Sequence, residues 1–330
     1  MSLSLRFLGT SASRPTVERG VAAVAIVREG ETLLVDCGEG TQRQMMRYGI
    51  SFAFGDILFT HFHTDHFLGL PGLLRTLTLQ ARTEPLRLWG PRGLHAMLKR
   101  AEGLGVERLS FPLEVAEVSP LTPIPRKGYV VLPFPVEHRA GAAVGYALIE
   151  EERRGRFHPE IARDLGIPEG PLWGQLAKGQ PVTLPDGRTI DVAMLVGPTR
   201  SGRRLVVTGD TRPCEATVEA AAGADLLVHE ATFGDEEAAR AIETGHSTAR
   251  EAAAIAARAG ARRLVLTHFS ARYSRDASEL EREARELFPA TSCARDGLEI
   301  IVPFLDAGPG EPAPALAENY FRANSDSGSG

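Results

Sequence analysis

Short apolar runs separated by glycine-rich or charged breaks dominate the first part of the chain. This pattern is typical of β-strands joined by turns. The first three runs predict a small antiparallel ladder and cover Leu3 to Leu8, Val21 to Val27 and Thr32 to Val35. Later runs predict strands at Asp56 to Thr60, Leu86 to Trp89, Leu205 to Thr208, Leu226 to Val228 and Arg263 to Thr267, and around Phe111, Val130 and Val144.

Between these strands the apolar positions recur with the spacing of a helix face. Pro in the first turn and Gly after the last turn mark several of the boundaries. Strands that alternate with helices indicate an α/β protein. The predicted helices are Glu39 to Tyr48, Thr64 to Ala81 with an interruption near Pro71, Pro91 to Gly103, Cys214 to Ala222, His246 to Ala259 and Ala277 to Phe288.

Two segments lack this regular pattern. Glycine and proline interrupt the stretch from Glu150 to Arg204 so often that we expect no packed core there. Within it, residues 153–204 contain nine basic and five acidic residues, which predicts a flexible, basic insertion. Residues 306–330 are rich in Gly, Pro, Ala and Ser, and we expect them to be disordered or foreign to the natural chain.

Composition narrows the class of protein. The 330 residues are 43% hydrophobic and 24% charged, which is average for a globular protein. The net charge of −5 excludes a basic surface over the whole molecule. Cys37, Cys214 and Cys293 form no spacing motif, and the apolar pattern disfavours a signal peptide and a membrane span, so we expect a cytoplasmic protein without a membrane partner.

The strongest chemical signal follows the predicted strand at Asp56 to Thr60. His61, His63, Asp65 and His66 lie within six positions there. Imidazole and carboxylate groups are ligands suited to Zn²⁺ and related metals. In α/β folds, ligands bind beyond the carboxyl ends of strands, where this cluster is expected to lie.

One tetrahedral ion cannot use all four residues and also keep a water molecule, so ligands from elsewhere would imply two metals. Three further residues of chelating type also follow apolar runs: His138, Asp210 and His268. Each is more often an ordinary loop residue when considered alone. Together with the first cluster, they predict one site with two metals.

This pattern of an H-x-H-x-D-H motif followed by a distant His, Asp and His resembles the metallo-β-lactamase superfamily. The resemblance covers residues 1 to about 305 and implies an αββα sandwich as the catalytic domain. Several motifs are more specific and resemble the ribonuclease Z family of tRNA 3′-processing endonucleases. They are Phe7-Leu8-Gly9-Thr10, Asp36-Cys37-Gly38-Glu39-Gly40-Thr41-Gln42, Gly209-Asp210-Thr211, His229-Glu230-Ala231-Thr232, His246-Ser247-Thr248 and the run from His268 to Tyr273.

The resemblance implies two Zn²⁺ ions per subunit and a role for each candidate. A metal-bound hydroxide would attack the phosphodiester that joins the 3′ trailer to precursor tRNA, leaving a 3′-hydroxyl on the tRNA. Asp65 would orient or deprotonate the hydroxide, and His246, oriented by Glu230, would protonate the leaving oxygen. The implied ligands are His61, His63, His138 and Asp210 for one zinc, and Asp65, His66, Asp210 and His268 for the other.

The insertion from Arg153 to Arg204 resembles the protruding arm with which the family grips tRNA, most clearly around Leu165 to Gly174. In the family, the arm of one subunit serves the site of the other in a homodimer. The implied substrate contacts are Arg153, Arg154, Arg156, Gly170, Pro171, Lys178 and Arg272.

One loop departs from the family pattern. Many members carry a P-x-K-x-R-N loop near the N-terminus, of which only Pro15 and Arg19 are present here. This difference leaves the cleavage position relative to CCA open. We assign no chemistry to His95, His158 and His229.

Two other functions fit parts of the pattern. A small-molecule hydrolase, such as a lactonase, thioesterase or arylsulfatase-like enzyme, could use the same metal site. A nucleic-acid-binding protein with a structural metal and no turnover is the second alternative.

Overall fold

The computed structural model describes residues 2–101, 108–139 and 141–304, so the predicted tail at 306–330 lies outside the described residues. The chain divides into two compact units, one containing Met1–Ile149 and Arg203–Pro303 and the other containing Glu150–Gly202. Within the described ranges, no helix has the length and apolar composition needed to cross a membrane.

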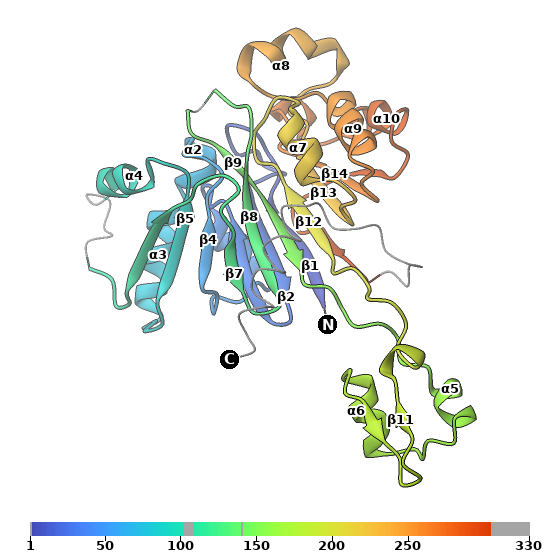
Figure 1. The fold of residues 1–330 in the computed structure, drawn as a ribbon. Helices are drawn as coiled ribbons and strands as arrows, with labels where there is room; N and C mark the ends of the chain where they lie inside the picture. The colour runs from blue at the N-terminus through green and yellow to red at the C-terminus, as the bar shows by residue number, and fades with distance from the viewer. Residues whose placement is uncertain (1, 102–107, 140, 305–330) are drawn as a thin grey trace. The chain divides into compact units, whose positions relative to one another are not determined.

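The first sheet of the larger unit has the strand order β16-β1-β2-β3-β4-β5-β6. Figure 1 labels β1, β2, β4 and β5 of this sheet. Strands β16, β1, β2 and β3 pair antiparallel, which confirms the predicted ladder, and β3 to β6 pair parallel. The short strand β16 has no counterpart in the predicted pattern. The strand bounds are β1 Leu3–Gly9, β2 Ala23–Arg28, β3 Glu31–Val35, β4 Asp56–Leu58, β5 Leu86–Gly90, β6 Leu113–Glu117 and β16 Glu299–Ile301.

The second sheet has the order β15-β14-β13-β12-β9-β8-β7. Strands β12 to β15 are parallel, so their carboxyl ends lie at one edge of the sheet. The bounds are β7 Ile124–Arg126, β8 Tyr129–Pro135, β9 Val144–Glu150, β12 Arg204–Val207, β13 Leu226–Glu230, β14 Leu264–Thr267 and β15 Thr291–Cys293.

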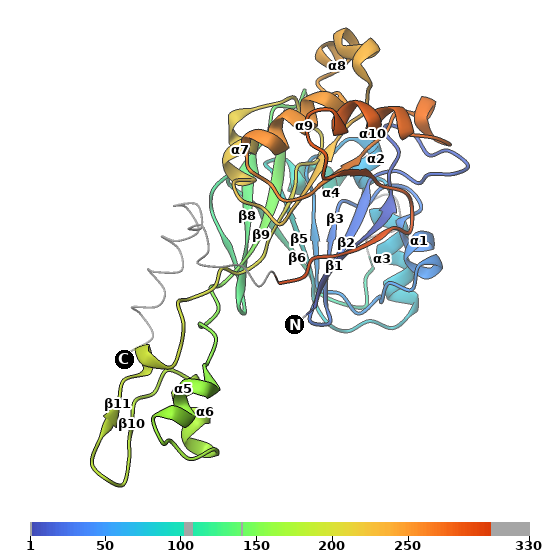
Figure 2. The same ribbon diagram turned by 90° about the vertical axis from the view of Figure 1, so that its right-hand side faces the viewer.

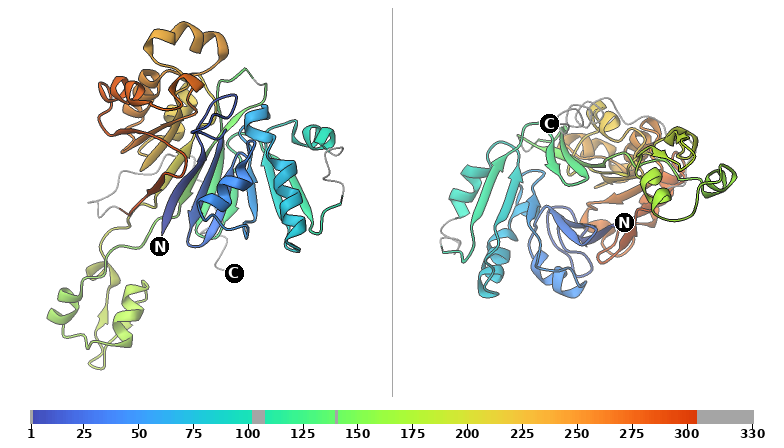
Figure 3. Two further views of the ribbon diagram at one scale, coloured as in Figure 1. Left: turned by 180° about the vertical axis from the view of Figure 1, so that it is seen from behind. Right: turned by 60° about the horizontal axis from the view of Figure 1, so that its bottom comes forward.

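Helices cover the outer face of each sheet, as the views from the side and from behind show (Figures 2 and 3). The predicted helix from Thr64 to Ala81 is broken around Gly69 rather than at Pro71, which lies in the first turn of the second piece. A side chain on Gly69 would lie 2.0 Å from the carbonyl oxygen of Gly38, so this close approach requires glycine. The helices beside the first sheet are α1 Thr41–Arg47, α2 Thr64–Phe67, α3 Leu70–Leu79 and α4 Leu94–Ala101.

On the side of the second sheet, the predicted helix from His246 begins only at Ala249. Thr248 caps it, because its hydroxyl accepts the amide proton of Glu251 and the Glu251 side chain accepts that of Thr248. Helix α8 was not predicted. These elements are α7 Glu215–Ala220, α8 Ala238–Thr244, α9 Ala249–Arg258 and α10 Ser278–Arg285, with the 3₁₀ turns η3 Asp235–Glu237 and η4 Ala271–Tyr273.

Three apolar layers hold this unit together. Leu5 and Phe7 of the first sheet pack with Tyr146 and Val207 of the second in the central layer. Separate apolar clusters lie between the first sheet and α3 and between the second sheet and α9. Burial of apolar area in all three layers stabilises the order helix, sheet, sheet, helix, and this order confirms the αββα sandwich.

The smaller unit has a packed core, so the expectation that its glycine and proline residues prevent one is wrong. Pro159 and Pro171 lie in the first turns of helices, where proline is tolerated, and the core includes Ile167, Leu176 and Leu195. Its elements are α5 Pro159–Asp164, α6 Pro171–Ala177, β10 Val182–Thr183, β11 Thr189–Ile190 and the 3₁₀ turn η2 Val192–Met194.

The smaller unit is also less basic than the sequence pattern indicated. Arg203 and Arg204, which the prediction assigned to the insertion, are buried in the larger unit, and Arg204 begins β12. Within Glu150–Gly202, seven basic residues stand against eight acidic ones. The predicted excess of positive charge is absent because the structural unit includes three acidic residues before Arg153 and excludes Arg203 and Arg204.

Candidate active site

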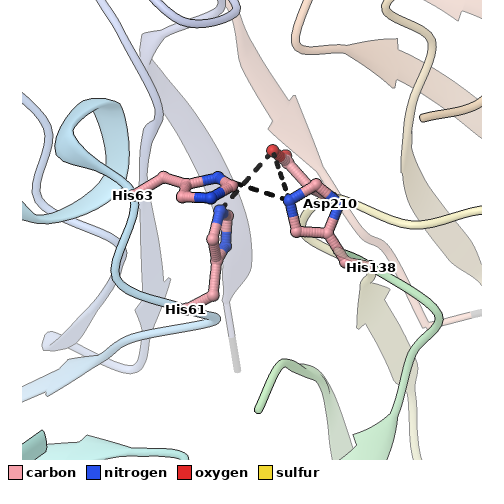
Figure 4. Close-up of side chains that lie close together, drawn as sticks. All are labelled: His61, His63, His138 and Asp210. Carbon is pink, nitrogen blue, oxygen red and sulfur yellow. Dashed lines mark hydrogen bonds and ion pairs between the residues drawn. The ribbon is translucent and has the colours of Figure 1, made fainter. Parts of the chain in front are cut away.

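Residues from both sheets meet where several strands end. His61 and His63 follow β4, His138 follows β8, and Asp210 follows β12. One possible ligand atom of each lies within 4.8 Å of those of the others, and Figure 4 shows the four side chains pointing toward one another. These are the four residues that the family resemblance implies as the ligands of one metal ion.

Three more predicted ligands form a second group beside the first. Asp65, His66 and His268 also have possible ligand atoms within 4.8 Å of one another. His268 Nε2 lies 3.4 Å from Asp65 Oδ2 and 3.3 Å from His66 Nε2. All three side chains are buried.

The carboxylate of Asp210 faces both groups. Its Oδ2 lies 3.6 Å from His61 Nε2 and 3.9 Å from His138 Nε2. Its Oδ1 lies 3.3 Å from His268 Nε2 and 3.4 Å from His66 Nε2. One oxygen therefore faces each group, which is the arrangement that a bridging carboxylate needs.

The donor atoms fit a metal centre. His61 Nε2 and Asp210 Oδ1 are buried and have no hydrogen-bond partner among the described residues. Leaving such atoms without a partner costs about 1 to 3 kcal/mol each, so the site has a strong demand for a bound cation. Imidazole nitrogens and carboxylate oxygens are ligands that zinc and similar metals accept.

The pKa shifts of the site residues also fit a bound cation. Burial opposes protonation of His66, but the carboxylates of Asp210 and Asp36 raise its pKa well above the usual value. Despite burial, His268 and His66 hold the pKa of Asp210 well below its usual range. Burial and the neighbouring His66 lower the pKa of His61, which leaves that imidazole neutral and able to act as a ligand.

Groups behind the predicted ligands fix how the imidazoles are turned. Asp36 Oδ2 lies 2.8 Å from His66 Nδ1, and the backbone carbonyl of Gly245 lies 2.9 Å from His138 Nδ1. Each contact leaves Nε2 facing the centre. Such partners orient metal-binding histidines and select their tautomer.

The roles of these supporting residues were missed in the sequence. Asp36 lies in a recognised motif, but nothing in the linear pattern showed that it faces a histidine 30 positions later. The supporting residues are Asp36, Thr60, Thr232 and Gly245.

Unusual backbone conformations bring these groups into place. Asp36 and His268 have φ angles of 61° and 60°, in the left-handed region that few residues other than glycine adopt. Gly209, just before Asp210, has a φ of 65°, and a side chain there would lie 2.7 Å from Thr60 Cβ. The turn after β12 therefore requires glycine.

His246 and Glu230 form a pair beside the two ligand groups. His246 Nδ1 lies 2.8 Å from Glu230 Oε1 and 3.9 Å from Asp210 Oδ2. Burial opposes protonation of His246, but Glu230 raises its pKa to about 9. The imidazole is therefore positively charged at neutral pH and can donate a proton from Nε2.

Asp65 is held from a second direction. The backbone N–H of Ser13 donates to Asp65 Oδ2 at 2.7 Å. Burial opposes ionisation of Asp65, but His268 and His66 hold its pKa well below the usual value, so it is a carboxylate at neutral pH.

The predicted substrate contacts lie in both units. Arg272 is in η4 of the larger unit and forms an ion pair with Glu237. The remaining predicted contacts belong to the smaller unit: Arg153, Arg154, Arg156, Gly170, Pro171 and Lys178. Of the histidines without an assigned role, His229 is fully buried, and its Nδ1 donates to the carbonyl of Glu230.

Two protein families match parts of the chain. A beta-lactamase superfamily domain matches residues 176–269, and a family described as anti-Pycsar protein Apyc1 matches residues 3–109. Solved structures with the same fold include the metallo-beta-lactamase fold protein YhfI from Bacillus subtilis, with a TM-score of 0.65 at 17% identity over 91% of this chain and 100% of that protein.

Similarity to named relatives is much closer and spans most of the chain. The chain is 63% identical to ribonuclease Z of Gemmatimonas aurantiaca over 91% of its own length and 96% of the relative's. It is 52% identical to ribonuclease Z of Myxococcus xanthus, over 92% of this chain and 99% of the relative. The short form of human tRNase Z has a TM-score of 0.66 at 30% identity, covering 91% of this chain and 99% of that protein. The chain thus belongs to the ribonuclease Z family, the endoribonucleases of the metallo-β-lactamase superfamily.

Proposed function

We propose that this enzyme removes the 3′ trailer from precursor tRNA and leaves a 3′-hydroxyl on the tRNA. The observation that carries the proposal is the arrangement around Asp210, with one ligand group at each oxygen and the His246–Glu230 pair beside them. The substrate follows from the relatives, which are named ribonuclease Z or tRNase Z.

The cofactor we propose is a pair of zinc ions. His61, His63, His138 and Asp210 would hold one ion, and Asp65, His66, His268 and Asp210 the other. Bound at these residues, two cations would lower the pKa of a shared water molecule and stabilise the charge that develops on the attacked phosphate.

The remaining chemistry falls to side chains of this chain. Asp65, ionised and held by the Ser13 amide, can accept a proton from the attacking water or orient it. His246 can give its Nε2 proton to the leaving 3′ oxygen, while its Nδ1 proton stays on the hydrogen bond to Glu230. The two residues thus supply the acid and the base that phosphodiester hydrolysis needs.

For substrate binding, we propose that the smaller unit, Glu150–Gly202, contacts the tRNA backbone. Its net charge does not support this role, because acidic residues slightly outnumber basic ones. The support comes from the resemblance of its central segment to the tRNA-gripping arm of the family, with Arg153, Arg154, Arg156 and Lys178 as candidate phosphate contacts. The homodimer in which each arm serves the other subunit stays a prediction.

A cleavage assay tests the function directly. Purified enzyme with bound zinc is incubated with a precursor tRNA, and the ends of the products are determined. We expect one cut that leaves a 3′-hydroxyl on the tRNA and a 5′-phosphate on the trailer. Binding without cleavage would support a nucleic-acid-binding protein instead, and hydrolysis of lactones or thioesters in place of tRNA would support a small-molecule hydrolase.

A further inference from the structure

We propose that the hydroxyl of Thr232 is a positioning group that connects the second ligand group to the proton donor. It would hold His268 with Nε2 toward the centre, and it would hold Glu230 against His246. The inference rests on the proposed two-metal site and adds to it a residue that selects the ligating nitrogen of one histidine.

The hydrogen bonds of Thr232 show which group donates and which accepts between Glu230 and His268. Its Oγ1 donates to Glu230 Oε2 at 2.7 Å and lies 3.0 Å from His268 Nδ1. A hydroxyl has a single proton, and here that proton is on the bond to Glu230. The bond to His268 must therefore be donated by the imidazole, which places the His268 proton on Nδ1.

A neutral His268 with its proton on Nδ1 has its lone pair on Nε2, which is the form that a metal ligand requires. That atom faces Asp210 Oδ1 at 3.3 Å and Asp65 Oδ2 at 3.4 Å, on the side of the second ligand group. A nitrogen must be free of its proton to bind a metal. Thr232 therefore selects Nε2 as the nitrogen that can bind.

The carboxylate of Glu230 accepts four hydrogen bonds, so its position is fixed as well as its charge. Its Oε1 accepts from His246 Nδ1 at 2.8 Å and from the Thr211 amide at 3.0 Å. Its Oε2 accepts from the amide and the hydroxyl of Thr232 at 3.1 and 2.7 Å. The carboxylate is 1% exposed, so no bulk water can replace a lost donor.

One buried carboxylate therefore orients two imidazoles. It holds His246 directly and His268 through the Thr232 hydroxyl. The backbone supports the same connection, because the amide of Ser270, two residues after His268, donates to the carbonyl of Thr232 at 3.1 Å.

Replacing Thr232 with valine removes the hydroxyl while nearly preserving shape, and replacing it with serine keeps the hydroxyl. Metal-free protein is titrated with zinc against a chromophoric chelator, so that two equivalents are resolved. His268→Ala identifies the zinc equivalent that belongs to the second group.

We expect Thr232→Val to lower the affinity for that zinc equivalent about 10- to 100-fold, the usual effect of removing such a hydrogen-bond partner, and to leave the affinity for the other equivalent unchanged. Thr232→Ser should restore the affinity.

A matched control is Thr217→Val, because Thr217 is also fully buried but lies on α7 and contacts Cys214. It should leave both equivalents unchanged. If Thr232→Val binds both equivalents with the affinity of the unsubstituted protein, the inference is wrong. If the unsubstituted protein binds fewer than two equivalents, it is the proposed two-zinc site that fails.

A measurement on the unsubstituted protein covers the case in which the valine variant does not fold. Nitrogen-resolved NMR of the zinc-loaded enzyme shows which ring nitrogen of His268 carries the proton. We expect the proton on Nδ1, protected from exchange with solvent by the bond to Thr232. A proton on Nε2, with Nδ1 bound to the metal, would overturn the proposal.

Discussion

At Asp210, the two oxygens of one side chain face different groups of candidate ligands. The geometry is set locally by the glycine before it and at long range by histidines from four separate segments of the chain. A residue shared in this way should show its role through metal content as well as through activity.

The first prediction concerns that shared role. Asp210→Ala should lower metal content at both positions, whereas His268→Ala should spare the group formed by His61, His63 and His138. Elemental analysis after dialysis should find close to two zinc equivalents in the unsubstituted chain, about one in His268→Ala and well below one in Asp210→Ala. Asp164→Ala, at an exposed site in the smaller unit, is the control. Equal metal loss in the two site variants would contradict the assignment.

A second prediction separates proton donation from metal binding. His246→Ala should lower the turnover of precursor tRNA by roughly two to four orders of magnitude, the usual size of a lost general acid, without changing metal content. A phosphodiester with a better leaving group should be affected much less, because its leaving oxygen needs no proton. Loss of zinc from His246→Ala would instead identify His246 as a ligand.

At the scale of elements, the parallel strands β12, β13 and β14 end side by side, and each carries a group of the site at its last residue or within three residues after it. Glu230 is the last residue of β13, and Asp210 and His268 follow β12 and β14. The turns that leave these strands are tight, and the left-handed backbone at Gly209 and His268 is part of that geometry. The site therefore depends on the strand ends as much as on the ligands.

The third prediction tests the turn after β12. Gly209→Ala should lower the free energy of unfolding by about 1 to 2 kcal/mol through the left-handed backbone and by a further 1 to 3 kcal/mol through the contact with Thr60. Gly260→Ala is a matched control, because Gly260 has a φ of 61° and open space around it. Gly260→Ala should lower the free energy of unfolding only by the contribution of the left-handed backbone. Urea unfolding of both metal-free variants measures the difference, and equal losses would show that the contact with Thr60 costs nothing.

For the whole molecule, the candidate catalytic residues and the proposed tRNA-binding segment lie in different compact units. All seven candidate ligands, together with His246 and Glu230, belong to the larger unit. The smaller unit has an apolar core of its own, which includes Ile167, Leu176 and Leu195. Removing it should therefore leave the metal centre intact.

The fourth prediction follows from this division. Replacing Glu152–Gly202 with a Gly/Ser linker should preserve zinc content and hydrolysis of bis(p-nitrophenyl) phosphate. Binding of precursor tRNA should weaken and its dependence on salt should flatten, because each lost phosphate contact removes about one released counterion. Filter binding at several salt concentrations measures both effects. Unchanged tRNA binding at every concentration would show that the smaller unit does not hold the substrate.

Much of the fold was predictable because the signals are local. The larger strands are buried on both faces of a sheet, so each is a continuous apolar run in the sequence. This run is visible without knowing which strand pairs with it. The edge strands β7, β15 and β16 were missed because each has only three residues and partial exposure. The core of the smaller unit was missed because proline and glycine are typical of loops, whereas Pro159 and Pro171 lie in the first turns of helices that pack in this core.

The sequence by itself determined the ribonuclease Z resemblance, which implied the αββα class. It also supplied the candidate ligands, because His61 to His66 are neighbours in the chain and the other candidates each follow an apolar run. Only the tertiary structure decided how the two oxygens of Asp210 are divided, that Asp36 faces His66, and that Thr232 lies between Glu230 and His268. The physical reason is that contacts within the site join residues as far apart as His66 and His268, 202 positions, and depend on backbone angles at single positions, which no local pattern records.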